Sequence, residues 1–130
     1  MKTLCVSLET AKKLKAAGWT KPTHFQWLIK NNGSQPDQIV DFHTDHHSEN
    51  HYTYFPCPTA EEVLRELPEK IDLNEWRRDL QFIFISPEKG KWEVSYGQFK
   101  KFKNKSISEA AAQMWLWCVE QGYIKTEAKP

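Results

Sequence analysis

The sequence predicts one α+β domain in which a leading helix is followed by two ββα units. Two observations predict this class. Helix-capping signals mark three separate helical stretches, and apolar residues alternate at period two in the stretches between them. The simplest assembly is a four-stranded, mainly antiparallel sheet packed with helices. We expect a single domain over residues 1–130, with frayed ends at 1–5 and 125–130.

The leading helix is predicted between Ser7 and Gly18 in SLETAKKLKAAGW. Ser7 is a favourable N-cap, Leu8, Ala11 and Leu14 follow at helical spacing, and Gly18 suits the left-handed residue that ends a helix. The lysines between these positions face water. A short amphipathic helix is therefore expected at the start of the domain.

The first hairpin is predicted in HFQWLIKNNGSQPDQIVDFH. Phe25, Trp27 and Ile29 alternate before NNGS, which favours a turn, and Val40 and Phe42 then share one face of a second strand. The stretch YTYFPCP, after the histidine-rich segment, is expected to be extended. Each of its prolines disfavours the helical conformation of the residue before it.

The second ββα unit follows a short helix in PTAEEVLRELP, where Thr59 and Glu62 form a capping box. In DLQFIFISPEKGKWEVSYG an apolar run precedes a turn containing Pro87 and Gly90. A second strand follows, in which Trp92, Val94 and Tyr96 alternate with polar residues. The apolar run predicts a central strand covered on both faces, with the second strand nearer an edge.

The last helix is predicted in SISEAAAQMWLWCVEQGY, with Ser106 as N-cap, Glu109 completing a second capping box and Gly122 as the stop. Apolar residues occupy most of its circumference, so it should be the most buried element. Trp115 in this helix, like Trp27 and Trp92 in the strands, is expected in the core.

Composition limits the classes of function. A formal charge of +1 provides no global field for nucleic acid or an anionic membrane. No stretch approaches the about 20 apolar residues of a membrane span. Cys5, Cys57 and Cys118 are scattered, and three reduced thiols suit a cytoplasm. We expect a cytoplasmic protein with no membrane contact.

The segment DFHTDHHSENH contains His43, His46, His47 and His51, which are candidate metal ligands. Imidazole and carboxylate groups bind zinc, the metal this composition would favour. No regular spacing aims these rings at one point, so a solvated polar loop is the preferred interpretation, with a pH-sensitive surface also open. The spacing leaves no room for the strand and helix of an HNH nuclease site. We expect no bound cofactor.

Two further segments are candidates for contact with a partner. FKKFKNK, Phe99 to Lys105, interleaves rings with lysines, a chemistry that stacks bases and neutralises phosphates but can also meet an acidic protein. LNEWRRDL combines a tryptophan with two arginines, as interface hot spots do, although a ring packed on a sheet edge is the simpler interpretation. The candidate residues are Trp76, Arg77, Arg78, Phe99, Lys100, Lys101, Phe102 and Lys103.

Catalysis is not supported by any motif in the sequence. Ser86, Ser95 and Cys57 lack a flanking nucleophile motif, and the five glycines are not spaced for a phosphate loop. The paired carboxylates Glu61 and Glu62 fall in the first turn of a helix, where the helix dipole already favours them. We therefore expect a protein without enzymatic activity.

Three segments, VSLETAKKLKAAGW, CPTAEEVLRELP and SEAAAQMWLWCVEQGYI, resemble small uncharacterised proteins of bacteriophages and prophages of gut bacteria. The resemblance covers roughly a third of the chain and carries no catalytic residues. It implies a phage accessory protein that works in the bacterial cytoplasm by binding a host or phage macromolecule, including components of host defence. The remaining hypotheses are a metal-binding protein or metal-dependent enzyme using the His43–His51 cluster, and a nucleic-acid-binding module using Phe99–Lys105.

Overall fold

The computed structural model describes residues 5–31, 33, 36–41, 52–72, 80–97 and 100–126. In this part of the chain three helices alternate with seven strands, which confirms a mixture of helix and strand but not the predicted order. The elements are α1 (Leu8–Ala16), β1 (Phe25–Lys30), β2 (Gln38–Asp41), β3 (Tyr52–Cys57), α2 (Ala60–Glu66), β4 (Lys70–Asp72), β5 (Leu80–Glu88), β6 (Lys91–Tyr96), β7 (Lys100–Asn104) and α3 (Ile107–Glu120).

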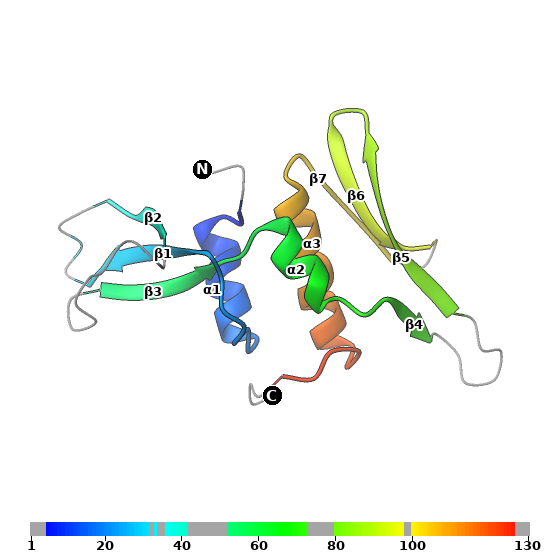
Figure 1. The fold of residues 1–130 in the computed structure, drawn as a ribbon, viewed down its shortest axis with the longest axis horizontal. Helices are drawn as coiled ribbons and strands as arrows, with labels where there is room; N and C mark the ends of the chain where they lie inside the picture. Colours follow the sequence, from blue (N-terminus) through cyan, green and yellow to red (C-terminus); the bar gives the residue numbers. More distant parts are fainter. Residues whose placement is uncertain are drawn as a thin grey trace.

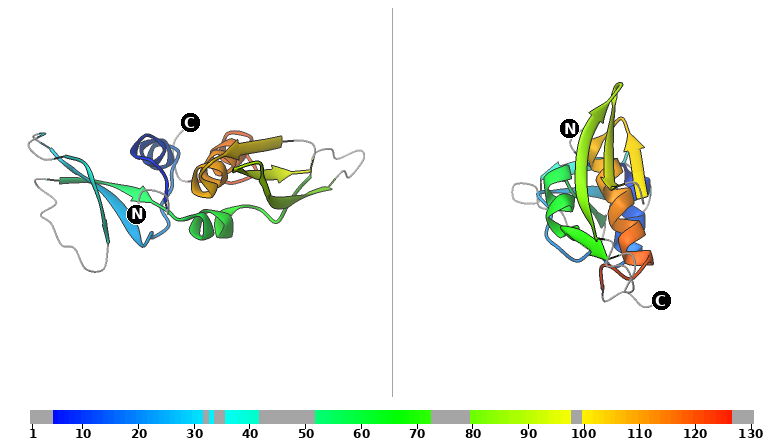
Figure 2. Two further views of the ribbon diagram at one scale, coloured as in Figure 1. Left: turned by 90° about the horizontal axis from the view of Figure 1, so that it is seen from above. Right: turned by 90° about the vertical axis from the view of Figure 1, so that its right-hand side faces the viewer.

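The predicted leading helix followed by two ββα units, with one four-stranded sheet, is wrong. Three strands lie between α1 and α2 and four lie between α2 and α3, and they form two separate antiparallel sheets rather than one. Figure 1 shows the sheets at opposite ends of an elongated molecule, with α2 and α3 between them, and Figure 2 shows the same separation from above. Strands β1 to β3 pair with one another, and so do strands β4 to β7, so the two halves of the chain contact each other through the helices.

The first sheet has the order β2-β1-β3. The hairpin of β1 and β2 is confirmed, with Trp27 opposite Ile39. On its other side β1 pairs with β3, where Trp27 lies opposite Phe55. The segment predicted only to be extended is therefore a third strand. Its partner lies about 25 residues earlier in the chain, beyond the reach of any local pattern.

Cys5 and Cys57 form a disulfide, with their Cα atoms 5.5 Å apart. Among the described cysteines only Cys118 is free, and it is buried. The expectation of three reduced thiols is therefore wrong. The two paired residues are separated by 52 positions, and the end of β3 brings them together.

The second sheet has the order β4-β5-β6-β7. β4 pairs only with Leu80–Phe82 at the start of β5, whereas β6 pairs with β5 from Ile83 to Glu88. The β5–β6 turn is Lys89–Gly90, with φ angles of 43° and 80°, as a tight two-residue hairpin requires. The predicted turn containing Pro87 is therefore shorter than expected, because β5 continues through Pro87 to Glu88.

β5 lies between β4 and β6, which is the central position predicted for it, whereas the position predicted for β6 is wrong. β6 lies between β5 and β7 and is not an edge strand. β7, in turn, lies within the segment FKKFKNK, which was predicted only as a candidate for contact with a partner. Ile85 of β5 is 42% exposed, so this strand is not covered on both faces along its length.

The three helices begin at the predicted residues. Ser7 caps α1, and Thr59 and Glu62 form the predicted capping box of α2. Ser106 caps α3, but the second half of its predicted box is not formed. The Ser106 N–H donates instead to Asn104 Oδ1 at 2.9 Å. The carboxylate of Glu109, which was expected to complete the box, instead accepts hydrogen bonds from Ser7 and Thr10 at the start of α1.

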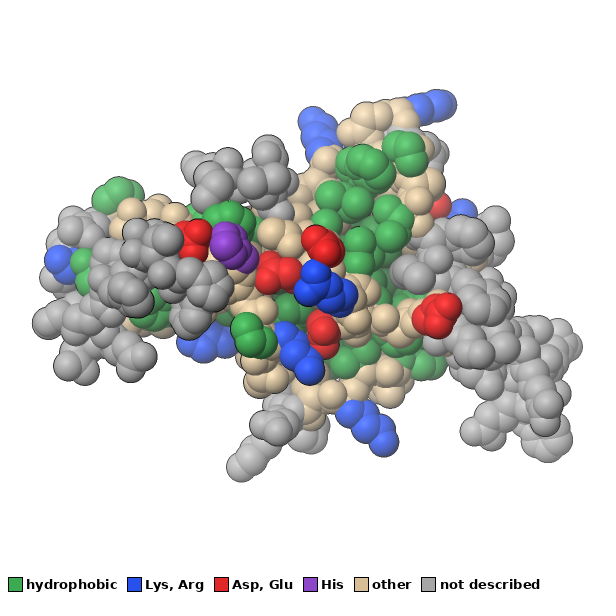
Figure 3. All heavy atoms as spheres, in the orientation of Figure 1, with side chains coloured by type: hydrophobic (Ala, Val, Ile, Leu, Met, Phe, Trp, Pro, Cys, Tyr) green, Lys and Arg blue, Asp and Glu red, His purple; other side chains and the backbone are tan. Residues whose placement is uncertain are grey.

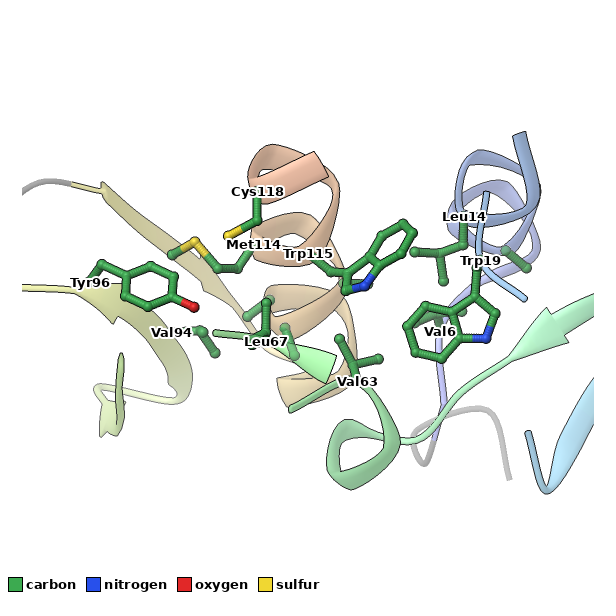
Figure 4. Close-up of a cluster of buried hydrophobic side chains, with 14 of the residues drawn as sticks. Val6, Leu14, Trp19, Val63, Leu67, Val94, Tyr96, Met114, Trp115 and Cys118 are labelled. Carbon is green, nitrogen blue, oxygen red and sulfur yellow. The ribbon is translucent and has the colours of Figure 1, made fainter. Parts of the chain in front are cut away.

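α3 carries much of the core and presents different faces to the two halves of the molecule. Met114 and Cys118 point toward Tyr96 of β6, whereas Trp115 lies on the side of α1, beside Trp19 (Figure 4). The two indole rings pack edge to face with centroids 5.1 Å apart. The prediction of a deeply buried last helix is confirmed. Among the described helices, none combines the length and apolar composition needed to cross a membrane.

Candidate interaction surface

The outer end of the β5–β6 hairpin carries an uncovered apolar face. Along β6, Lys91 and Trp92 are exposed, Glu93 is half-buried, and the residues from Val94 to Tyr96 are buried. Burial therefore increases steadily away from the turn. Figure 1 shows the reason, because the hairpin extends beyond the helices that cover its inner end.

Three apolar side chains lie on this uncovered end. Trp92 is 37% exposed and lies opposite Pro87, while Ile85 lies opposite Val94. Residues opposite each other in an antiparallel pair share a face, and so do alternate residues of one strand. Ile85, Pro87 and Trp92 therefore continue the face that carries buried Val94 and Tyr96. We call these three residues the hairpin surface.

The hairpin surface is part of a larger apolar band on the molecule. Figure 3 shows hydrophobic side chains gathered over the second sheet as it rises beside the helices. Ile85 and Trp92 are the exposed large hydrophobic residues among those described. Adjacent exposed apolar side chains mark contact surfaces, whereas single scattered ones do not. The sequence pattern did not single out Ile85. The signal that could have found it is Pro87, because proline within a strand indicates that this part of the strand lies at an edge.

Lysines are exposed at the turn of the hairpin and on the face of the second sheet opposite to the hairpin surface. Lys89 and Lys91 are exposed at the turn, and Lys101 is exposed on β7. Lys103 is also exposed and lies 3.8 Å from Glu93, whose side chain is only 15% exposed. A partner that reaches around the turn to this opposite face would meet these lysines, and acidic side chains match them best.

In the described part of the predicted basic segment, residues 100–105, the aromatic ring and two of the lysines lie on opposite faces of β7. In β7 the side chains of Lys101 and Lys103 are exposed, while Phe102 is partly buried and packs against the core. Strand alternation places the ring on the opposite face from these two lysines. Lys100, on the ring's own face, lies with its Nζ 5.0 Å from the Phe102 centroid and 5.8 Å from that of Trp117.

The outer strands carry features that oppose the addition of a foreign strand. Glu88 and Lys91 close the turn as a hydrogen-bonded pair, and Pro87 and Trp92 form the next pair, which is not hydrogen-bonded. The nitrogen of Pro87 therefore points away from β6, toward the outer edge of β5, and proline has no N–H to offer a further strand there. In the first sheet, Lys15 Nζ donates to the carbonyl of Tyr54 in edge strand β3, at 3.0 Å. The exposed Lys101 and Lys103 place charged side chains on edge strand β7, which also disfavours pairing with another strand. Contact through the side-chain face of the hairpin is therefore favoured over strand pairing.

The other predicted site residues lie outside the described residues. These are His43, His46, His47, His51, Trp76, Arg77, Arg78 and Phe99. Within the described ranges, no three His, Cys, Asp or Glu side chains gather closely enough to hold a metal ion. The histidine that is described, His24, lies with its Nε2 3.1 Å from Asp41 Oδ2, at the start of the first sheet.

A cleft of about 400 Å³ lies between α2, α3 and the segment after α1. Trp19 and Trp115 contribute to its lining, with Lys21, Glu66 and Lys125 among the charged residues. Lys21 Nζ lies 3.7 Å from Glu66, and Trp19 Nε1 donates to the Lys21 carbonyl at 2.9 Å. Among the described residues no buried side-chain nitrogen or oxygen lacks a partner. The described lining of the cleft thus contains no buried side-chain nitrogen or oxygen that a ligand would have to satisfy.

Tyr96 and Cys118 form a buried polar pair between β6 and α3. The Tyr96 hydroxyl donates to the Pro68 carbonyl at 2.6 Å. Burial raises the pKa of the Cys118 thiol to about 11, and burial followed by interaction with Cys118 raises the pKa of Tyr96. A buried thiol that holds its proton is a poor nucleophile. This pair therefore has the properties of a core contact.

The fold defines a small α+β protein with two antiparallel sheets joined by helices, and with exposed apolar side chains on one hairpin. No protein-family model matches this sequence, and neither a curated protein nor a solved structure matches it.

Proposed function

We propose that this chain is a non-catalytic binding protein that acts by occupying a host or phage protein through the hairpin surface. The observation that carries the proposal is the exposure of Ile85 and Trp92 on a face that is otherwise used for packing. Apolar area removed from water contributes about 25 cal/mol per Å² to a complex, against the entropic cost of association. Aromatic residues at a contact commonly contribute more than their neighbours.

The partner we propose is an acidic protein surface. The described lysines at the turn and on the opposite face of the second sheet support this choice, because opposite charge speeds encounter and disfavours basic partners. The resemblance to small phage proteins supports a host or phage protein as the source and the bacterial cytoplasm as the place of action. A gene position among phage genes would support that origin, and a chromosomal position among unrelated genes would contradict it.

The test compares three forms of the protein as baits in a lysate of a gut bacterium. They are the wild type, the double variant Ile85→Ser with Trp92→Ser, and the control Tyr52→Ser, which removes an aromatic ring at the other end of the molecule. A partner captured by the wild type and the control, but lost with the double variant, supports the proposal. Equal capture by all three forms contradicts it. The captured protein should also dissociate more readily at 0.5 M than at about 0.1 M salt.

Nucleic acid is the second candidate partner, and exposed Lys101 and Lys103 on β7 are the observation that favours it. The probes are a single-stranded and a double-stranded oligonucleotide, titrated at two salt concentrations. Binding that weakens as salt rises, and that is lost in Lys101→Ala with Lys103→Ala, would replace the protein-binding proposal.

The metal hypothesis for His43, His46, His47 and His51 has a separate test, because these residues lie outside the described part of the chain. Stoichiometric zinc in the purified protein, together with a lower melting temperature after chelation, would support a metal site. Protein without metal and with an unchanged melting temperature would remove this hypothesis.

A further inference from the structure

We propose that the Cys5–Cys57 disulfide is a redox latch. Its reduction loosens α1 and the first sheet, while β6, β7 and their packing on α3 stay in place. The latch fastens residues 5–7, which we call the N-terminal strap. This inference does not rest on the proposed function, because the strap leads into α1, near the middle of the molecule, whereas the hairpin surface lies in the second sheet (Figure 1).

The N-terminal strap joins elements that are distant in sequence. Cys5 is bonded to Cys57 at the end of β3 and makes an antiparallel bridge with Thr59, next to α2. Val6 is fully buried, and its carbonyl accepts a hydrogen bond of 3.0 Å from Trp27 Nε1 in β1. The strap therefore contacts the first sheet, the start of α2 and the core at once.

The last strap residue continues into the N-terminus of α1. The backbone N–H of Ser7 donates to the Glu109 carboxylate in α3, and the Ser7 side chain caps α1 by accepting from the Thr10 N–H. A strap released from β3 therefore also loosens the position of α1 on α3. The disulfide is the covalent tie that keeps these weaker contacts together.

The second sheet is held on α3 by side chains that lie outside the strap. Its core contacts are made by Val94 and Tyr96 of β6 with residues of α3, including Met114 and Cys118 (Figure 4). Neither partner of the disulfide belongs to these elements. Opening of the latch should therefore be local, in the way that native proteins open in separate cooperative units.

The chemical step is a thiol–disulfide exchange with a dithiol as the reductant. The S–S bond breaks, two electrons and two protons pass from the dithiol, the protein retains two thiols, and the reductant becomes a disulfide. Both cysteines are almost fully buried, at 1% and 0% exposure, so the reductant reaches the sulfur atoms only when the strap opens. A reducing cytoplasm would keep the latch open, and an oxidising compartment would keep it closed.

The test is amide hydrogen exchange of the purified chain before and after treatment with dithiothreitol. Peptides from β1 and β3 should exchange at least about tenfold faster in the reduced protein, whereas those from β6 should change by less than about twofold. Titration of thiols in denaturant should give one per chain before reduction, from Cys118, and three afterwards. Cys118→Ser is the matched control and should keep the full response.

The variant Cys57→Ser should exchange like the reduced wild type and should not respond to dithiothreitol. If this variant does not fold, the reduced wild type supplies the same measurement. Three thiols per chain without reductant would overturn the proposal, and so would unchanged exchange in β1 and β3. An equal increase in β6 would also overturn it, because the response would then be global.

Discussion

The carboxylate of Glu109, in the first turn of α3, accepts a hydrogen bond of 2.6 Å from the hydroxyl of Thr10 in α1. The same carboxylate accepts the backbone N–H of Ser7, which is the N-cap of α1. One side chain thus ties together the N-terminal ends of two helices. Its negative charge is favourable there, because both helix dipoles have their positive ends at these termini.

Replacing Glu109 with alanine should lower the free energy of unfolding by about 2 kcal/mol, because two hydrogen bonds to a charged acceptor are lost. Glu109→Gln should cost less, since its amide oxygen still accepts one bond. Urea denaturation measures both, and a cycle with Thr10→Val isolates the contact between the two side chains. Glu120→Ala, at an exposed position of α3, is the control. Equal losses for Glu109→Ala and the control would contradict the role of this tie.

Trp92 and Val94 should respond very differently to truncation, although they lie two residues apart on one face of β6. Val94 is fully buried, so Val94→Ala should lower the free energy of unfolding by about 2 kcal/mol. Trp92 is 37% exposed, and Trp92→Ala should change it by less than about 1 kcal/mol. Urea denaturation checks both values. A large loss at Trp92 would mean that its ring contributes to folding and not only to a contact surface.

The lysines of edge strand β7 should protect the protein from self-association. Replacing Lys101 and Lys103 with valine leaves an apolar strand with an unpaired edge, so we expect larger species to form as concentration rises. Light scattering after size-exclusion chromatography measures this. The control, Lys12→Val with Lys13→Val, removes the same charge from α1. If both double variants remain monomeric, or both associate, the edge-specific explanation fails.

Stability should fall as pH rises from about 9 to about 11. Burial raises the pKa of Cys118 from its ordinary value of 9.0 to about 11. The unfolded chain therefore releases this proton first, and the stabilisation present below pH 9 is lost as pH rises through the folded-state pKa. Two pKa units correspond to at most about 3 kcal/mol. The raised pKa of Tyr96 acts in the same direction at slightly higher pH.

Urea denaturation at intervals from pH 7.5 to 10.5 measures this dependence. Cys118→Ala should show a shallower decline over this range, with the contribution of Tyr96 remaining. A decline of equal slope in the wild type and in Cys118→Ala would show that the thiol is not its source.

The candidate surface could be predicted only in part. Lys101 and Lys103 were predicted as partner-binding residues, and the structure places both on an exposed face. Trp92 was expected in the core, because its alternation with polar residues is the same whether or not a helix covers that face. The length of the hairpin relative to α3 decides its exposure. Strand periodicity carries no information about where the covering helix ends.

The sequence by itself determined the helix starts at Ser7, Thr59 and Ser106, and the strands from Phe25 to Lys30 and from Lys91 to Tyr96. Capping, periodicity and turn chemistry act over about four residues, so they are legible in a single stretch. The tertiary structure alone decided that the strands divide into two sheets, that Cys5 meets Cys57, and that Glu109 turns to α1. These outcomes depend on which distant segments share a core, and short patterns do not encode that choice.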